Sequence, residues 1–361
     1  MGTSFVSLWN SNSVANAAAK PTPTPKIKVK TTPTPKPVTP VPAPTSVVVQ
    51  PTPKPTETPD EIIKIDTELV NLNVRVIDRN NRPVNNLQEK EFKVMENGVV
   101  QQIDFFSKSE VPTNYAMVID NSGSMRQLLD KVIEAGKILI NTNRPDDETM
   151  LIRFVSRDKI EIEQPFTANK TDLNDALDNL FIEGGQTAII DALYLAVENT
   201  DEYEKAQKDK DHKRRALILV SDGEDRNSYY NEKQLFELLR ESEVQIYVIG
   251  FVNELSKDGG FIAKSPQDKA KAFLQRIAEE TGGKAYFPNS SSELPNLAKE
   301  ISNELRTQYS IGYIPSNEAK DGTYRTIKVT VNDGPKQEKR IAITKAGRTV
   351  EGGTTPPTKP K

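Results

Sequence analysis

The sequence contains no cysteine, and it has only one histidine and one tryptophan among 361 residues. The lack of cysteine excludes disulfides, thiol nucleophiles and zinc–thiolate centres. A single histidine leaves little room for the nucleophile–histidine pairs that many hydrolases use. The net charge of -3 gives no reason to expect nucleic acid or an anionic membrane as a partner. No apolar run approaches the length of a membrane span.

Both ends of the chain are poor in residues that build a core. Residues 1–20 hold a short apolar stretch and an alanine-rich site typical of signal peptidase cleavage, without a basic region before them, so they are either a signal remnant or a disordered N-terminus. Residues 21–60 repeat threonine, proline and lysine, which predicts an extended linker or a stalk through a cell wall or periplasm. Residues 348–361 are expected to form a disordered tail.

Two β-rich flanks enclose the middle of the chain, at residues 61–111 and 308–347. In the first flank, Asn97-Gly98 separates two apolar runs, which predicts a hairpin that Phe105 and Phe106 continue. Neither flank has enough strands to be stable alone. We therefore expect the flanks to pair into one small β-sandwich, with the central domain inserted between them.

The central segment, residues 112–307, alternates apolar runs with segments of helical periodicity. This alternation predicts a doubly wound, mostly parallel sheet, and the short, charged strand near 159–163 is expected at an antiparallel edge. The other strands are expected near 115–120, 149–155, 215–221, 244–250 and 284–287. The helices are expected near 125–142, 170–180, 188–201, 231–241, 267–281 and 292–307.

Oxygen-bearing side chains follow the strands of this predicted sheet. A capped helix start explains any one such turn alone. However, the loops that carry these side chains can converge at one edge of the sheet, at the carboxyl ends of the strands. That edge is where open α/β sheets bind ligands. Carboxylates and hydroxyls suit a hard cation such as Mg²⁺. The candidate metal ligands are Asp120, Ser122, Ser124, Thr187 and Asp222.

This set resembles the metal-ion-dependent adhesion site of von Willebrand factor A (VWA) domains. The matching residues are Asp120-x-Ser122-x-Ser124, Thr187 in a Gly-Gly-x-Thr loop and Asp222 in Ser-Asp-Gly. The resemblance covers about residues 114–307 and implies a doubly wound fold, a bound Mg²⁺ or Mn²⁺, and ligand binding rather than catalysis. It also implies that the last aspartate acts through water. Residues 84–98 resemble a segment found before VWA domains in exported bacterial proteins.

Two carboxylates and three hydroxyls would roughly balance the charge of the ion and leave positions for water. The carboxylate of an Asp or Glu on a partner protein can replace one water, which predicts an adhesion-type binding module. One alternative is a structural scaffold whose metal only braces the loops. Another is a Mg²⁺-dependent hydrolase with Asp120 as nucleophile, although Ser122 stands where such an enzyme needs a second acid.

Overall fold

The computed structural model describes residues 69–108, 111–207, 213–257 and 264–350. The predictions for residues 1–60 and for most of the C-terminal tail lie outside these residues. The described chain holds one six-stranded sheet and two four-stranded sheets. Among these residues, no helix is both long enough and apolar enough to cross a membrane.

The six-stranded sheet is the centre of the fold, with strand order β10-β9-β8-β5-β6-β7. Its neighbours pair in parallel except β6 and β7, which are antiparallel. This confirms the predicted mostly parallel sheet and its antiparallel edge. The strands are β5 (Thr113–Asp120), β6 (Glu148–Phe154), β7 (Ile160–Thr167), β8 (Arg214–Ser221), β9 (Gln245–Gly250) and β10 (Ala285–Tyr286).

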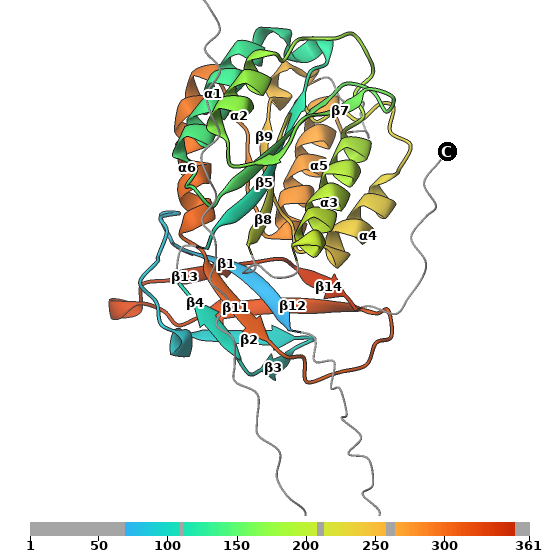
Figure 1. Cartoon of the computed structure of the whole chain (residues 1–361). Coiled ribbons are helices and arrows are strands. Elements are labelled where there is room, and N and C mark those ends of the chain that lie inside the picture. Colours follow the sequence, from blue (N-terminus) through green and yellow to red (C-terminus); the bar gives the residue numbers. More distant parts are fainter. Residues whose placement is uncertain (1–68, 109–110, 208–212, 258–263, 351–361) are drawn as a thin grey trace, which may run out of the picture. The chain divides into compact units, whose positions relative to one another are not determined.

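Helices cover both faces of this sheet, which makes the fold doubly wound (Figure 1). One face packs against α1 (Leu129–Thr142), α2 (Lys170–Asp178) and α6 (Leu294–Arg306). The other packs against α3 (Ile189–Ala206), α4 (Glu232–Glu241) and α5 (Pro266–Thr281). The described residues also contain five short 3-10 helices: η1 (Glu89–Glu91), η2 (Gly123–Gln127), η3 (Val252–Glu254), η4 (Ser291–Glu293) and η5 (Pro335–Gln337).

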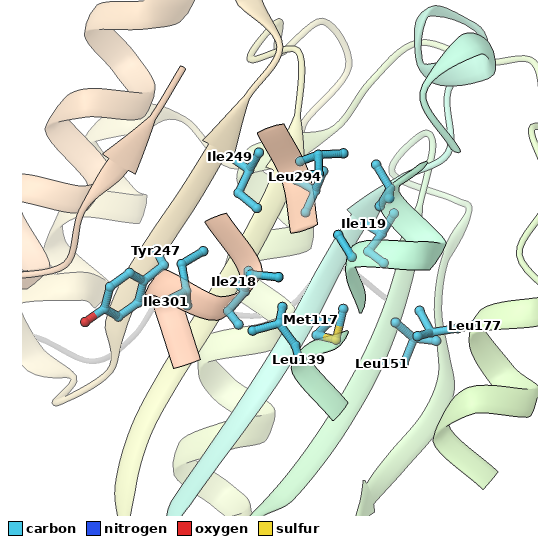
Figure 2. Packing of buried hydrophobic residues seen from close by; sticks show 14 of the residues in the cluster. Met117, Ile119, Leu139, Leu151, Leu177, Ile218, Tyr247, Ile249, Leu294 and Ile301 are labelled. Carbon is cyan, nitrogen blue, oxygen red and sulfur yellow. The ribbon is translucent and has the colours of Figure 1, made fainter. Parts of the chain in front are cut away.

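Strand β5 shows why the sequence forms this sheet. All its residues are buried, because successive side chains point to opposite faces and both faces are covered. Met117 and Ile119 enter the core on the α1 side, whereas Ala116 and Val118 enter the core on the α3 side. Figure 2 shows Met117 and Ile119 beside residues of β6, β8 and β9 and of the covering helices.

The two four-stranded sheets combine strands from before and after the central sheet. One has the order β13-β1-β11-β4 and the other β14-β12-β2-β3, with a shared apolar core between them. The structure therefore contains the small β-sandwich of the predicted fold class. Its strands are β1 (Val70–Asp78), β2 (Phe92–Glu96), β3 (Val99–Gln101), β4 (Phe105–Ser107), β11 (Tyr309–Tyr313), β12 (Tyr324–Val331), β13 (Arg340–Ile343) and β14 (Gly347–Thr349).

Two local expectations differ from the structure. The Asn97-Gly98 hairpin forms, with φ of 48° and 79° at its two turn residues, but Phe105 and Phe106 do not continue it. They belong to β4, which pairs with β11 in the opposite sheet, because Phe106 packs on Tyr309 in the sandwich core with 5.8 Å between ring centroids. Strand β14 also extends ordered structure past residue 347, into the segment expected to be tail.

Candidate metal centre

The first part of the site is the turn between β5 and α1. Asp120 ends β5, and Ser122 is the N-cap residue of η2. The Ser122 side chain makes no capping hydrogen bond to the helix; its Oγ instead lies 3.0 Å from the Oγ of Ser124. A simple capped helix start therefore does not explain this pattern, since the hydroxyls face each other rather than the helix backbone.

Asp120 lies at the bottom of the site with no solvent exposure. Its Oδ1 accepts a hydrogen bond from the Ser122 backbone N–H at 2.9 Å, and its Oδ2 accepts one from the Ser221 hydroxyl at 2.7 Å. Burial is the main cause that raises the pKa of Asp120 to about 6; the Ser122 hydrogen bond opposes this rise, and the nearby charge of Asp222 adds to it. The site is therefore short of positive charge.

Thr187 is held by the glycine loop that enters α3. The loop is anchored on the first turn because the Glu183 N–H donates to the Asn121 carbonyl at 2.9 Å. It also lies tight against the residue that follows β6: a Cβ at Gly185 would be 2.5 Å from Cγ1 of Val155, so a larger residue there would have to displace the Val155 side chain. The glycine pair thus brings Thr187, which is 6% exposed, to the edge of the site.

Asp222 follows β8 directly, and its loop is joined to the Thr187 loop. The Thr187 carbonyl accepts backbone N–H groups from Arg226 at 2.8 Å and from Asn227 at 3.1 Å. Gly223 has φ of 86°, a left-handed conformation that favours glycine. Oδ1 of Asp222 accepts the Glu224 N–H at 3.0 Å. The three loops therefore form one connected unit at the carboxyl edge of the sheet.

These loops surround a pocket of about 250 Å³. Ser122, Ser124, Thr187 and Asp222 line it. Asp120 does not line the pocket but lies behind it, joined to it through Ser122. The structure thus gathers the predicted ligands at one place, with Asp120 as its buried base.

Two residues that shape the site were not predicted. Ser221 donates to Asp120 and accepts the Gly223 N–H at 3.1 Å, so its hydroxyl joins the first and third loops. Its position beside Asp222 at a strand end was the only available signal. The side-chain amide of Asn121 donates to the Phe181 carbonyl at 2.8 Å and fixes the start of the glycine loop, a role that no local pattern in the sequence indicates.

The residues present fit a divalent cation. In the part of the chain that the structure describes, no cationic side chain forms an ion pair with Asp120 or Asp222. Among the same residues, no cluster of three or more acidic or histidine side chains is placed to hold a metal. A metal here would therefore depend on hydroxyl oxygens as well as carboxylates, which is the donor chemistry of Mg²⁺ rather than of zinc.

Comparison with known proteins identifies the family of the central domain. The family model of the von Willebrand factor type A domain matches residues 115–300, just over half of the chain. The chain therefore belongs to the VWA domain family. Domains of this family typically mediate protein interactions, and they often bind a divalent metal.

Individual relatives cover this chain only in part. An uncharacterized protein of Synechocystis sp. is 30% identical over 194 residues, which are 53% of this chain and 41% of that protein. Inter-alpha-trypsin inhibitor heavy chain H4 of Bos taurus is 27% identical over 62% of this chain and 24% of its own length. The chain thus spans less than half the length of either relative. A solved von Willebrand factor type A structure from Catenulispora acidiphila aligns over 78% of this chain and 75% of its own, with 12% identity and a TM-score of 0.44.

Proposed function

We propose that this protein is a metal-dependent adhesion module. In this proposal Asp120, Ser122, Ser124, Thr187 and Asp222 hold a Mg²⁺ or Mn²⁺ ion, directly or through water. The observation that carries it is the fully buried Asp120 beside Asp222, with no basic group paired to either among the described residues. Removing a carboxylate from water without compensation is costly, so the folded site favours a cation from solution.

The bound ion would supply positive charge and coordination positions that a partner's carboxylate can take. We propose that the partner is a protein presenting an Asp or Glu to the 250 Å³ pocket. The chain's own residues do the positioning: the Ser122 and Ser124 hydroxyls lie 3.0 Å apart at the mouth, and the Thr187 loop closes one side. The proposal includes export to the periplasm, cell surface or medium of a bacterium.

A structural scaffold is the second candidate, since the three loops are already joined by hydrogen bonds. Binding of a carboxylate ligand separates the two candidates, because a metal that only braces loops needs no outside acid. A hydrolase has less support, because Ser122 lies beside Asp120 in place of a second acid. The proposal is accordingly for binding without catalysis.

The first test is calorimetric unfolding in Mg²⁺ and in EDTA. A metal at about 100 times its Kd adds about 2.7 kcal/mol to the free energy of unfolding. For a domain of this size that corresponds to a rise in Tm of about 5–10 °C. Asp120→Asn should abolish the rise, whereas Glu338→Gln, an exposed acid in the sandwich, should keep it. Equal melting of the wild type in both buffers would contradict metal binding.

The second test concerns the partner. Proteins retained from the cell envelope on the immobilised chain should elute with EDTA and should be displaced by an aspartate-containing peptide. The matched asparagine peptide should not displace them, because an amide adds no negative charge to the shell. A partner that stays bound in EDTA, on a chain that still shows the metal-dependent rise in Tm, would leave the metal as a brace and refute the adhesion function.

A further inference from the structure

A second cleft, of about 510 Å³, lies away from the metal pocket. It is at the amino-terminal ends of β5 and β8, where Pro112 leads into the central sheet and Arg214 begins β8. The metal pocket is at the carboxyl ends of the same strands. The cleft lies between the outer face of the β1–β11–β4 sheet and the start of the central domain, so its two walls come from different parts of the fold.

The sandwich wall of this cleft carries an apolar patch, beside the polar side chains of Asn71, Asn73 and Ser310. Leu69 and Phe105 form this patch, and they are 40% and 47% exposed. Both side chains lie close to Gly312: a Cβ built at Gly312 would lie 3.0 Å from Cβ of Phe105 and 3.3 Å from Cδ1 of Leu69. Val111 and Pro112 extend the apolar surface toward the central domain. A ligand with an apolar body would remove these groups from water.

The opposite wall is polar, and among its described residues the charged side chains other than Arg214 have charged partners or polar hydrogen-bond partners. Lys213 pairs with Glu148 at 2.8 Å, and Arg215 pairs with Asp201 at 2.7 Å and with Glu243. Glu204 accepts hydrogen bonds from Asn114 and from the Lys213 backbone. The charges of the described residues that border the cleft are therefore largely balanced, apart from the charge of Arg214. These pairs leave Arg214 as the group that decides which ligand the cleft prefers.

Arg214 is 3% exposed, and within the described chain its guanidinium donates its hydrogen bonds to neutral oxygens. Nε donates to Oδ1 of Asn73 at 3.2 Å, and the terminal nitrogens donate to the Leu305 carbonyl, the Gln308 carbonyl at 3.5 Å and the Ser310 hydroxyl at 3.4 Å. Among the same residues no carboxylate forms an ion pair with it. Asn73 and Ser310 themselves line the cleft, so the guanidinium lies at its floor.

Burial is the main cause that lowers the pKa of Arg214 to about 10, and the charges of Tyr247 and Asp147 oppose the change. The guanidinium is therefore still protonated at neutral pH. Asp147 is already committed elsewhere, because it accepts the backbone N–H groups of Thr113 at 2.9 Å and Arg144 at 2.8 Å. A buried cation with only neutral partners is costly, and one anion would offset that cost.

We infer that this cleft binds a small amphipathic monoanion, namely a carboxylate on an extended apolar chain. The carboxylate would replace the long hydrogen bonds at Arg214, and the apolar chain would lie along Leu69 and Phe105. The cleft volume falls within the range of about 300–1,000 Å³ that is usual for small-ligand sites. A neutral amphiphile would leave the guanidinium uncompensated, and a cationic one would be repelled by it.

Decanoate is the probe, titrated into the full chain by calorimetry, with decanol and decylammonium as matched ligands. Decanoate should bind at least tenfold more tightly than either. Phe105→Ser and Leu69→Ser should each weaken decanoate several-fold without unfolding the chain, because both side chains are already half exposed. The control is Ile341→Ser, which is equally exposed at 46% and is not part of the cleft. It should leave the affinity unchanged.

Three results would overturn the inference: no binding of decanoate below its micellar range, decanol binding as tightly as decanoate, or equal weakening by Ile341→Ser. If the Arg214→Gln variant folds, it should no longer prefer decanoate over decanol. If the variant does not fold, the comparison of decanoate with decanol in the wild type decides whether the cleft prefers an anion. A fourth such result would be tighter binding of a short acidic peptide rich in isoleucine than of decanoate, which would assign the cleft to a protein segment. Binding should be equal in Mg²⁺ and EDTA, so this test is independent of the metal site.

Discussion

Two buried carboxylates in this molecule have opposite surroundings. Glu96, in the β-sandwich, is 3% exposed and lies between two arginines, with Arg325 at 3.1 Å and Arg348 at 3.2 Å, while the Tyr313 hydroxyl donates to it at 2.6 Å. Asp120, at the end of the central sheet, is equally buried but meets hydroxyls, a backbone N–H and the charge of Asp222. One carboxylate is neutralised within the chain and the other is not.

The two sites differ in how the charge of a buried carboxylate is compensated. In the sandwich, Glu96 of β2 meets Arg325 of β12 and Arg348 of β14, so the charge of this carboxylate is compensated once the sheet has formed. At the candidate metal site, the described cation that lines the pocket, Arg226, pairs with Glu224 rather than with Asp120 or Asp222, so we propose that the charge which compensates Asp120 comes from solution. We expect disruption of the closed network to affect mainly the stability of the fold, and disruption of the open one to affect mainly metal binding. Disrupting each network in turn separates these two roles.

The largest effect is expected from opening the closed network. Glu96→Ala would remove the carboxylate that the buried Arg325 and Arg348 share, and breaking a buried pair in this way typically costs about 3–5 kcal/mol. Urea unfolding measures this loss directly. Replacing all three charged residues with apolar ones of similar size should cost much less, because no charge then stays buried. A loss below about 1 kcal/mol for Glu96→Ala would show that water already reaches these arginines.

The next effect concerns pH and the open site. Because the folded-state pKa of Asp120 is raised from 3.8 to about 6, the metal-free fold binds this proton more tightly than the unfolded chain. The resulting stabilisation is complete below about pH 4 and is lost as the pH rises through 6. A shift of this size corresponds to roughly 2–3 kcal/mol.

The measurement is the free energy of unfolding in EDTA between pH 4 and pH 7, compared with Asp120→Asn. The wild type should lose stability relative to the variant as the pH rises, since asparagine cannot ionise. With saturating Mg²⁺ the trend should reverse, because metal and proton compete for the same carboxylate. Parallel pH curves for the two proteins in EDTA would show that Asp120 is already neutralised by a group in the fold.

The sequence was sufficient for whatever depends on local pattern. The parallel sheet followed from apolar runs such as that of β5, and the grouping of Asp120, Thr187 and Asp222 at one edge followed because each stands next to a strand or helix terminus. Pairings between distant segments were harder to foresee. Three features depend on contacts between residues that are more than ninety positions apart in the sequence. They are the pairing of Phe105 in the opposite sheet, the ion pair between Arg348 of β14 and Glu96, and the cleft at Arg214. Such contacts leave no periodic signal in the sequence.

The smallest expected effect tests whether the Thr187 loop matters only to the open site. Gly185→Ala would place a Cβ 2.5 Å from Cγ1 of Val155, whereas a Cβ at Gly184 would meet no atom within 4 Å, so Gly184→Ala is a matched control. Overpacking of this kind costs about 1 kcal/mol at the low end of its range, because the side chain of Val155 can shift. Metal affinity should fall several-fold in Gly185→Ala as Thr187 moves, and stay unchanged in Gly184→Ala.

Restoring the space with Val155→Ala should recover the affinity. If both alanine variants bind Mg²⁺ as the wild type does, Thr187 is not positioned by this contact, and the glycine pair serves only the entry into α3.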